Sequence, residues 1–290
     1  TVYGEIPYDR LDLWRRFCNY YYNCLRDVDR HMMKLIHSLE DTGQIDNTII
    51  FMISDHGEML GQQGARGKIV SWEESIRVPT LVYHPDLKDK KLCNSVISNI
   101  DIVPTLLEFT GLSKSELRDK HPELKGNSYA ELVENVNYDN VRDKEGHLIH
   151  GVQIIPTVFE VAEKFRHTAL ADGFLAKTKA FMSEGKFLPD FTPPLNYKGV
   201  VDKKHKFLRF FSPRQNNIPT NYDELTKYNA EYQLYDLEND PFEMNDLAKD
   251  ENNRDLLMSM NDKCNTLADK EIGLENHVIH LPGPDWFWTA

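Results

Sequence analysis

The sequence predicts an α/β fold, with a mixed, mainly parallel sheet flanked by helices and a small C-terminal antiparallel sheet that packs against a helix. Two observations lead to this class. Residues 48–54, TIIFMIS, show no alternation of polar and apolar side chains, which is typical of a strand buried on both faces in a parallel sheet. Helical patterns lie on both sides of this strand along the chain, which is the order of elements expected in an α/β domain.

The first helix is predicted over residues 9–41, because apolar side chains recur there every three or four positions and Gly43 follows. A second short strand is predicted at 80–83, between two prolines. Residues 101–109 predict another helix, since Pro104 falls in its first turn, where a proline is tolerated, and Gly111 follows its end.

The second half of the chain has a different texture. Residues 113–198 are charged, punctuated by proline and glycine, and only weakly periodic, so we expect loops and short helices there. Strands are expected at 200–211 and 231–237, and a closing helix at 253–272. The expected domains are residues 1–125, an α/β domain; residues 126–199, an irregular insert or linker; and residues 200–290, a C-terminal α+β subdomain.

The composition excludes several classes of protein. Of the 290 residues 40% are hydrophobic and 28% charged, which is globular rather than disordered. A formal net charge of −12 argues against a nucleic-acid partner, because phosphate binding needs a basic surface. We find no apolar run near the roughly 20 residues that a membrane span needs. The four cysteines fit neither a zinc motif nor a disulfide framework.

The stretch from Ile53 to Pro79 carries the most chemical information. It begins where the buried strand ends, and ligands of open α/β sheets bind at the carboxyl ends of strands. Asp55 offers a carboxylate for a divalent cation, and His56 offers a ring nitrogen for a cation or an anionic ligand. Four glycines then allow a tight loop, which can bring the ammonium of Lys68 back to the same place.

Each of these features also has an ordinary structural interpretation. An Asp-His pair after a strand is more often a turn with a hydrogen-bonded histidine, and a single lysine is usually solvated. Glu73, Glu74 and Arg77 are also explained by surface ion pairs, which contribute less than about 1 kcal/mol.

Five motifs in order change this balance. They are Ser54–Glu58 (SDHGE), Lys68, Trp72–Pro79 (WEESIRVP), Asn99–Leu107 (NIDIVPTLL) and Leu234–Pro241 (LYDLENDP). This set resembles the later half of the catalytic domain of the sulfatase family, in the alkaline-phosphatase-like superfamily. The resemblance covers residues from about 10 to 112 and from about 200 to 273.

The resemblance implies that Asp55 and His56 are metal ligands. It implies that Lys68 is a catalytic residue and that Lys68 and His56 contact the substrate. The implied cofactor is one divalent cation, calcium, with manganese or magnesium as alternatives. The position of His56 is more often asparagine in this family, and an imidazole is a poorer calcium ligand than an amide oxygen.

The family's nucleophile is a cysteine or serine in the motif C/S-x-P-x-R, and this residue is oxidised to formylglycine. None of the cysteines or serines of this sequence stands in that pattern. The family places the motif, with two further metal-binding aspartates, ahead of the first helix. We therefore expect this chain to be a fragment that does not turn over substrate by itself.

The implied function is a metal-dependent hydrolase of sulfuric esters, acting on a small-molecule or glycan sulfate. Two alternatives remain open: a phosphodiester or phosphonate monoester hydrolase of the same superfamily, and a non-catalytic binding protein on this scaffold. The resemblance favours a secreted, periplasmic or lysosomal-type compartment. The particular ester and the oligomeric state cannot be read from the sequence; specificity loops are expected within residues 113–198 and around Trp286 and Trp288.

Overall fold

The computed structural model describes residues 6–7, 9–68, 70–87, 89–152, 196–211, 218–228 and 231–273. The expected specificity loops around Trp286 and Trp288, and most of those expected within 113–198, lie outside these ranges. The chain forms two compact units. The first comprises residues 1–95, 99–121 and 128–139, and the second comprises 96–98, 122–127 and 140–290.

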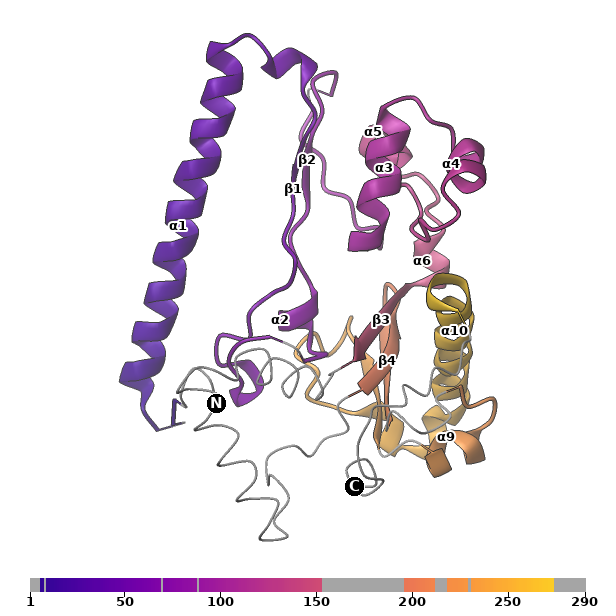
Figure 1. Ribbon diagram of the computed structural model, residues 1–290. Helices are drawn as coiled ribbons and strands as arrows, with labels where there is room; N and C mark the ends of the chain where they lie inside the picture. Colours follow the sequence, from indigo (N-terminus) through magenta and orange to yellow (C-terminus); the bar gives the residue numbers. More distant parts are fainter. Residues whose placement is uncertain are drawn as a thin grey trace, which may run out of the picture. The chain divides into compact units, whose positions relative to one another are not determined.

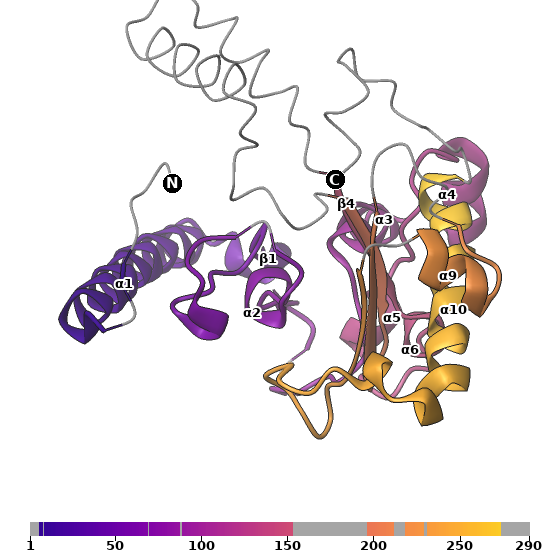
Figure 2. The same cartoon turned by 90° about the horizontal axis from the view of Figure 1, so that it is seen from below.

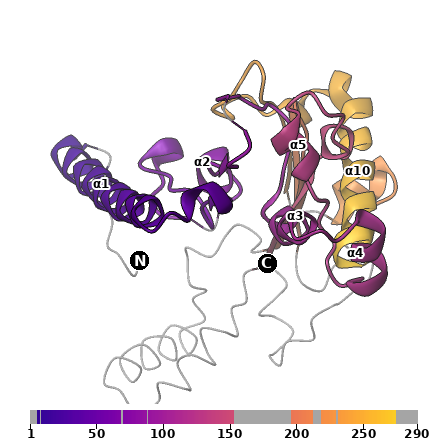
Figure 3. The ribbon, with the colours of Figure 1, turned by 90° about the horizontal axis from the view of Figure 1, so that it is seen from above.

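The first unit begins with a long helix, as the periodicity predicts. Its helices and strands are α1 (Leu11–Asp41), β1 (Ile50–Met52), α2 (Glu73–Ile76), β2 (Leu81–Tyr83), α3 (Ile102–Phe109), α4 (Lys114–Lys120) and α5 (Ala130–Glu134). Figure 1 shows β1 and β2 side by side, and Figure 3 gives a second view of α3, α4 and α5.

Strand β1 packs against the helices that follow it. The ring of Phe51 lies 6.2 Å from that of Phe109 at the end of α3 and 6.5 Å from that of Tyr129, which precedes α5. Thr105 links the two helices, since its buried hydroxyl donates to the carbonyl of Asp101 and accepts from the backbone N–H of Tyr129. These contacts fix the position of the strand from which the candidate site begins.

The α/β class is confirmed, but the expected parallel pairing is wrong for the strands in the described ranges. Strand β1 pairs with β2 in antiparallel register, with Phe51 opposite Val82. The parallel assignment assumed that both faces of the strand were buried. All three residues of β1 are partly exposed instead. A uniformly apolar strand was therefore not evidence here for burial on both faces or for parallel pairing.

The second unit is a four-stranded antiparallel sheet in the order β3-β4-β5-β6, with helix α10 against one face (Figures 1 and 2). Its helices and strands are α6 (Arg142–Glu145), β3 (His147–Val152), β4 (Asn196–Val201), β5 (His205–Phe211), α9 (Tyr222–Tyr228), β6 (Glu231–Asp236) and α10 (Arg254–Ile272). Its core is a cluster of buried side chains from the sheet, α9 and α10: Val200, Phe207, Leu225, Leu234, Leu257, Met260, Cys264 and Leu267.

Two expectations for this half need correction. The single strand predicted over 200–211 is two strands, because the chain reverses after Asp202, whose carboxylate accepts from the backbone N–H groups of Lys204 (2.9 Å) and His205 (2.8 Å). Strand β3 lies in the stretch expected to hold only loops and short helices. The strand at 231–237 and the helix at 253–272 are confirmed as β6 and α10.

Candidate functional site

The candidate site begins three residues after β1, in a turn held by hydrogen bonds. The hydroxyl of Ser54 donates to the carbonyl of His56 at 2.9 Å, and the side-chain amide of Asn99 donates to the carbonyl of Ser54 at 3.0 Å. Asn99 lies in the short 3₁₀ helix that precedes α3. The turn carrying Asp55 and His56 is thus tied both to itself and to the next part of the same unit.

Asp55 is an exposed carboxylate that follows β1. The backbone N–H of His56 donates to its Oδ1 at 3.0 Å, and this hydrogen bond is the main reason that the pKa of Asp55 is lowered from its usual value. The charges of His56 and Lys68 act in the same direction. Its side chain is 82% exposed, so the second oxygen, Oδ2, is accessible to a ligand.

The ring of His56 is oriented by its neighbours. Its Nδ1 lies 2.8 Å from the carbonyl oxygen of Gly57, and because a carbonyl can only accept, Nδ1 donates to it. Its Nε2 lies 3.2 Å from Oδ2 of Asp55 and in hydrogen-bond contact with the ammonium of Lys68. The structure thus brings together the three side chains that the sequence singled out.

The glycine-rich loop from 57 to 68 gives Lys68 its position. At Gly57 a Cβ atom would lie 2.0 Å from the carbonyl oxygen of Glu74, and its N–H donates to the carbonyl of Ser75 at 2.7 Å. Gly61 and Gly67 have φ angles of 100° and 88°, which side chains rarely allow. The glycines are therefore required by close approach and by backbone conformation, as the sequence predicts.

The donor atoms of Asp55 and His56 fit two positions around one cation. Ligand atoms at about 2.3 Å from a metal and at right angles to each other are about 3.2 Å apart, and Oδ2 and Nε2 are separated by 3.2 Å. In the described part of the chain, no group of three or more histidine, cysteine, aspartate or glutamate side chains could hold a metal ion. These two residues alone would not complete a coordination shell, and the assignment of a metal to them stays a prediction.

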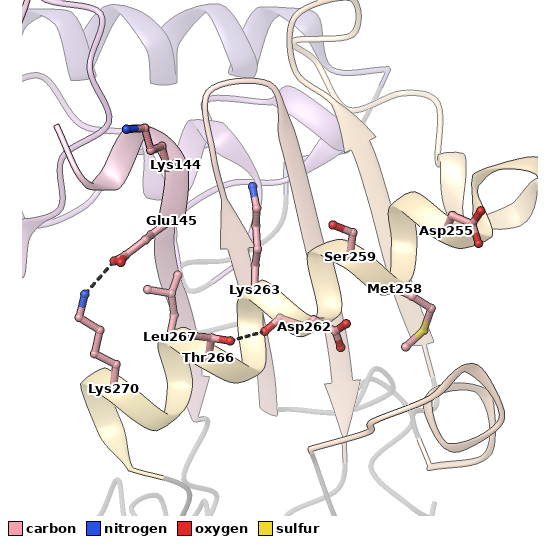
Figure 4. A pocket seen from close by; sticks show the side chains of 10 residues that line it. All are labelled: Lys144, Glu145, Asp255, Met258, Ser259, Asp262, Lys263, Thr266, Leu267 and Lys270. Carbon is pink, nitrogen blue, oxygen red and sulfur yellow. Dashed lines mark hydrogen bonds and ion pairs between the residues drawn. The ribbon is translucent and has the colours of Figure 1, made fainter. Parts of the chain in front are cut away.

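A cavity lies in the other unit and contains none of these residues. It is a cavity of about 590 Å³ along α10 (Figure 4), lined by Lys144, Glu145, Asp255, Met258, Ser259, Asp262, Lys263, Thr266, Leu267 and Lys270. Lys270 pairs with Glu145 at 2.7 Å, and Lys263 pairs with Asp202 at 2.6 Å. Because carboxylates already neutralise these two ammonium groups, the cavity is no obvious anion site.

Sequence reasoning gave no role to the residues that support the site. Ser54 and Asn99 fix the turn, and Glu58 contacts the backbone of the loop next to Lys68. All three lie inside motifs quoted above, but only the hydrogen bonds reveal what they do.

The first part of the chain matches a known protein family. Residues 6–112 match the family described as Sulfatase. A curated relative, an "Extracellular sulfatase SULF-1 homolog" of Drosophila melanogaster, is 35% identical over 96 residues, which is 33% of this chain and 9% of that protein. No helix in the described ranges is long and apolar enough to cross a membrane.

Two solved structures share the fold over most of the chain. One is BT4656 in complex with its substrate D-glucosamine-2-N,6-O-disulfate, with a TM-score of 0.57, 19% identity, and coverage of 87% of this chain and 40% of that chain. The other is a phosphonate monoester hydrolase of Agrobacterium radiobacter, with a TM-score of 0.58, 21% identity, and coverage of 87% and 41%. The chain spans less than half the length of each of these proteins.

Proposed function

We propose that the protein, whose residues 6–112 match the Sulfatase family, is a hydrolase of sulfuric esters and that its site includes Asp55, His56 and Lys68. The observation that carries the proposal is the convergence of these three side chains at the exit of β1. A carboxylate, an imidazole and an ammonium, each from a different position in the sequence, meet within hydrogen-bond distance. A structural role alone does not require this combination.

We propose that Asp55 and His56 hold one divalent cation, calcium, with manganese or magnesium as alternatives. When bound, such a cation polarises the oxygens of the ester. Asp55 is suited to this role because its carboxylate is exposed and offers oxygen ligands, which divalent cations of this kind prefer. His56 is suited because the bond from Nδ1 to the carbonyl of Gly57 turns Nε2 toward Asp55.

Lys68 is proposed to contact the sulfate or the leaving ester oxygen. An ammonium next to an oxygen that gains negative charge stabilises the transition state more than the bound substrate, an effect of about 2–4 kcal/mol for a preorganised group. In this structure the ammonium donates to His56, and we propose that substrate binding redirects it to the ester. The net charge of −12 does not oppose anion binding, because charges more than about 8–10 Å away are largely screened.

The nucleophile would come from outside this sequence, in the motif that the family places before the first helix. We propose that it is a formylglycine. The residues described here would then bind and orient the ester and compensate its charge, and sulfated sugars are one substrate class to test, since BT4656 binds one.

A phosphonate monoester hydrolase is the second candidate, because an enzyme of that activity shares this fold. The relative rates of hydrolysis of an aryl sulfate and of a phenyl phosphonate ester by the purified protein decide between the two. A preference for the phosphonate would overturn the sulfatase assignment. Failure to hydrolyse either ester, in a full-length protein without the C/S-x-P-x-R motif, would favour a non-catalytic binding protein.

The site assignment is tested with Asp55→Ala and Lys68→Ala in the intact protein. We expect Asp55→Ala to lower both bound metal, measured by elemental analysis, and activity, and Lys68→Ala to lower turnover about 10²-fold with little change in melting temperature. Asp46→Ala, which removes an exposed carboxylate of the same unit, is the control. Normal metal content in Asp55→Ala would remove Asp55 from the metal site, and an unchanged rate in Lys68→Ala would make Lys68 a scaffold residue.

A further inference from the structure

We propose that Glu58 is a positioning residue that holds Lys68 in place for catalysis. The inference rests on the proposed function, in which Lys68 contacts the ester. Glu58 lies two residues after His56, at the start of the glycine-rich loop. Its half-buried side chain contacts Gly67, the residue before Lys68, at the end of the same loop.

The carboxylate of Glu58 joins the two ends of the loop by a hydrogen bond. Its Oε1 accepts a hydrogen bond from the backbone N–H of Gly67 at 2.6 Å. The carbonyl of the same glycine accepts from the backbone N–H of Met59 at 3.0 Å, and the side chain of Met59 is fully buried. Both backbone polar groups of Gly67 are therefore bonded to residues 58 and 59, so the Cα atom of Lys68 starts from a fixed point.

The loop needs the hydrogen bond from Gly67 to Glu58 because its backbone is strained. Leu60 and Gln63 have φ angles of 48° and 50°, a region that residues other than glycine rarely adopt. A conformation of this kind persists when surrounding contacts enforce it. A hydrogen bond to a carboxylate is shorter and stronger than one between neutral groups, which suits this task.

Helix α1 contacts the loop that leads to Lys68. The pKa of Tyr21 is raised by burial and then by the carboxylate of Glu58, which puts that charge next to the helix. Gly61 lies against the ring of Trp14, where a Cβ atom would be 3.3 Å from the ring, and the guanidinium of Arg66 lies 5.6 Å from the centre of the Phe17 ring. The loop is thus held by contacts with α1 and by the hydrogen bond between Glu58 and Gly67.

The test compares Glu58→Ala and Glu58→Gln with Asp46→Ala in the intact protein, with an aryl sulfate as substrate. We expect Glu58→Ala to lower kcat by about 10²-fold, since misplacing a catalytic group by about 1 Å has an effect of that size. KM should change much less, because Lys68 acts mainly on charge that develops in the transition state. Glu58→Gln should recover most of kcat, because its amide oxygen can accept the same N–H, and Asp46→Ala should match the wild type.

A lower melting temperature in Glu58→Ala, with kcat unchanged per folded molecule, would overturn the inference, as would an equal loss in Glu58→Gln and Glu58→Ala. The ¹⁵N chemical shifts of the His56 ring provide a readout that does not need activity. If Lys68 leaves Nε2, these shifts change in Glu58→Ala and return in Glu58→Gln; unchanged shifts in both variants would also overturn the inference. A wild-type protein that hydrolyses no sulfate ester would overturn the proposed function. The ¹⁵N chemical shifts of the His56 ring would still decide the role of Glu58.

Discussion

Lowering the pH from 7 to 5 should destabilise the second unit, in part through the half-buried His147. Burial, followed by the charges of Arg142 and Lys206, lowers the pKa of His147 on β3 from 6.5 to about 4. Its buried Nδ1 has no hydrogen-bond partner in the part of the chain that the structure describes. The folded state therefore keeps this ring neutral at a pH where the unfolded chain has already protonated it.

The sign and size follow from proton linkage. Above pH 6.5 the ring is neutral in both states and contributes no pH dependence, whereas between pH 6.5 and about 4 the unfolded state binds more protons. Stability therefore falls as the pH falls through this window. The full difference corresponds to about 3 kcal/mol, of which about 2 kcal/mol is expressed between pH 7 and pH 5. The paired carboxylates mostly titrate below this range.

The assay is urea unfolding followed by circular dichroism at pH 7, 6 and 5. His147→Phe replaces the ring with one that cannot be protonated, so the part of the pH dependence that His147 contributes, about 2 kcal/mol between pH 7 and pH 5, should disappear. His150 stays in this variant and keeps its own share of the pH dependence, because burial and then the charge of Lys198 lower its pKa to about 4 as well. His205→Phe leaves His147 in place and should keep the wild-type dependence. A wild type of constant stability over this range, or a His147→Phe variant with the wild-type slope, would refute the reasoning.

Three further substitutions test contacts of the fold, by urea unfolding. Gly57→Ala should cost about 1–3 kcal/mol and disturb the site, because the new methyl group would meet the backbone of Glu74. Glu271→Ala should cost about 3–5 kcal/mol, since it leaves the buried Arg142 without the carboxylate now 2.9 Å away, whereas Arg142→Met combined with Glu271→Leu should be close to neutral. Asn261→Ala should cost about 2–3 kcal/mol by removing the acceptor of a buried guanidinium. A loss below about 1 kcal/mol in any of the three single variants would contradict the contact concerned.

Long elements with strong periodicity could be predicted from the sequence. Helix α10 begins and ends within a residue of its prediction, because its apolar side chains recur every three or four positions and Gly273 follows it. Short strands could not be placed with the same certainty. Strand β1 has three residues, and its partner and direction depend on distant parts of the chain rather than on its own composition.

The hairpin of β4 and β5 was missed because only three residues separate the two strands and none of them is a glycine or a proline that would mark a turn. The local signal was the side chain of Asp202, which can accept from backbone N–H groups two and three residues later and so reverse the chain. Strand β3 could not be recognised from its own sequence, since its pairing partner, β4, begins more than forty residues later.

The candidate site was easier to locate than the fold around it, because most contacts that assemble it are local. The hydrogen bonds that join Asp55 to His56, His56 to Lys68 and Glu58 to Gly67 all span twelve residues or fewer. The spacing along the chain therefore contains most of the geometry that brings these groups together, whereas the direction of β1 depends on contacts that no local pattern encodes. The same argument limits the metal assignment, since a complete coordination shell needs donors beyond the two that this local segment provides. For this reason metal content in Asp55→Ala tests the function more directly than any property of the fold.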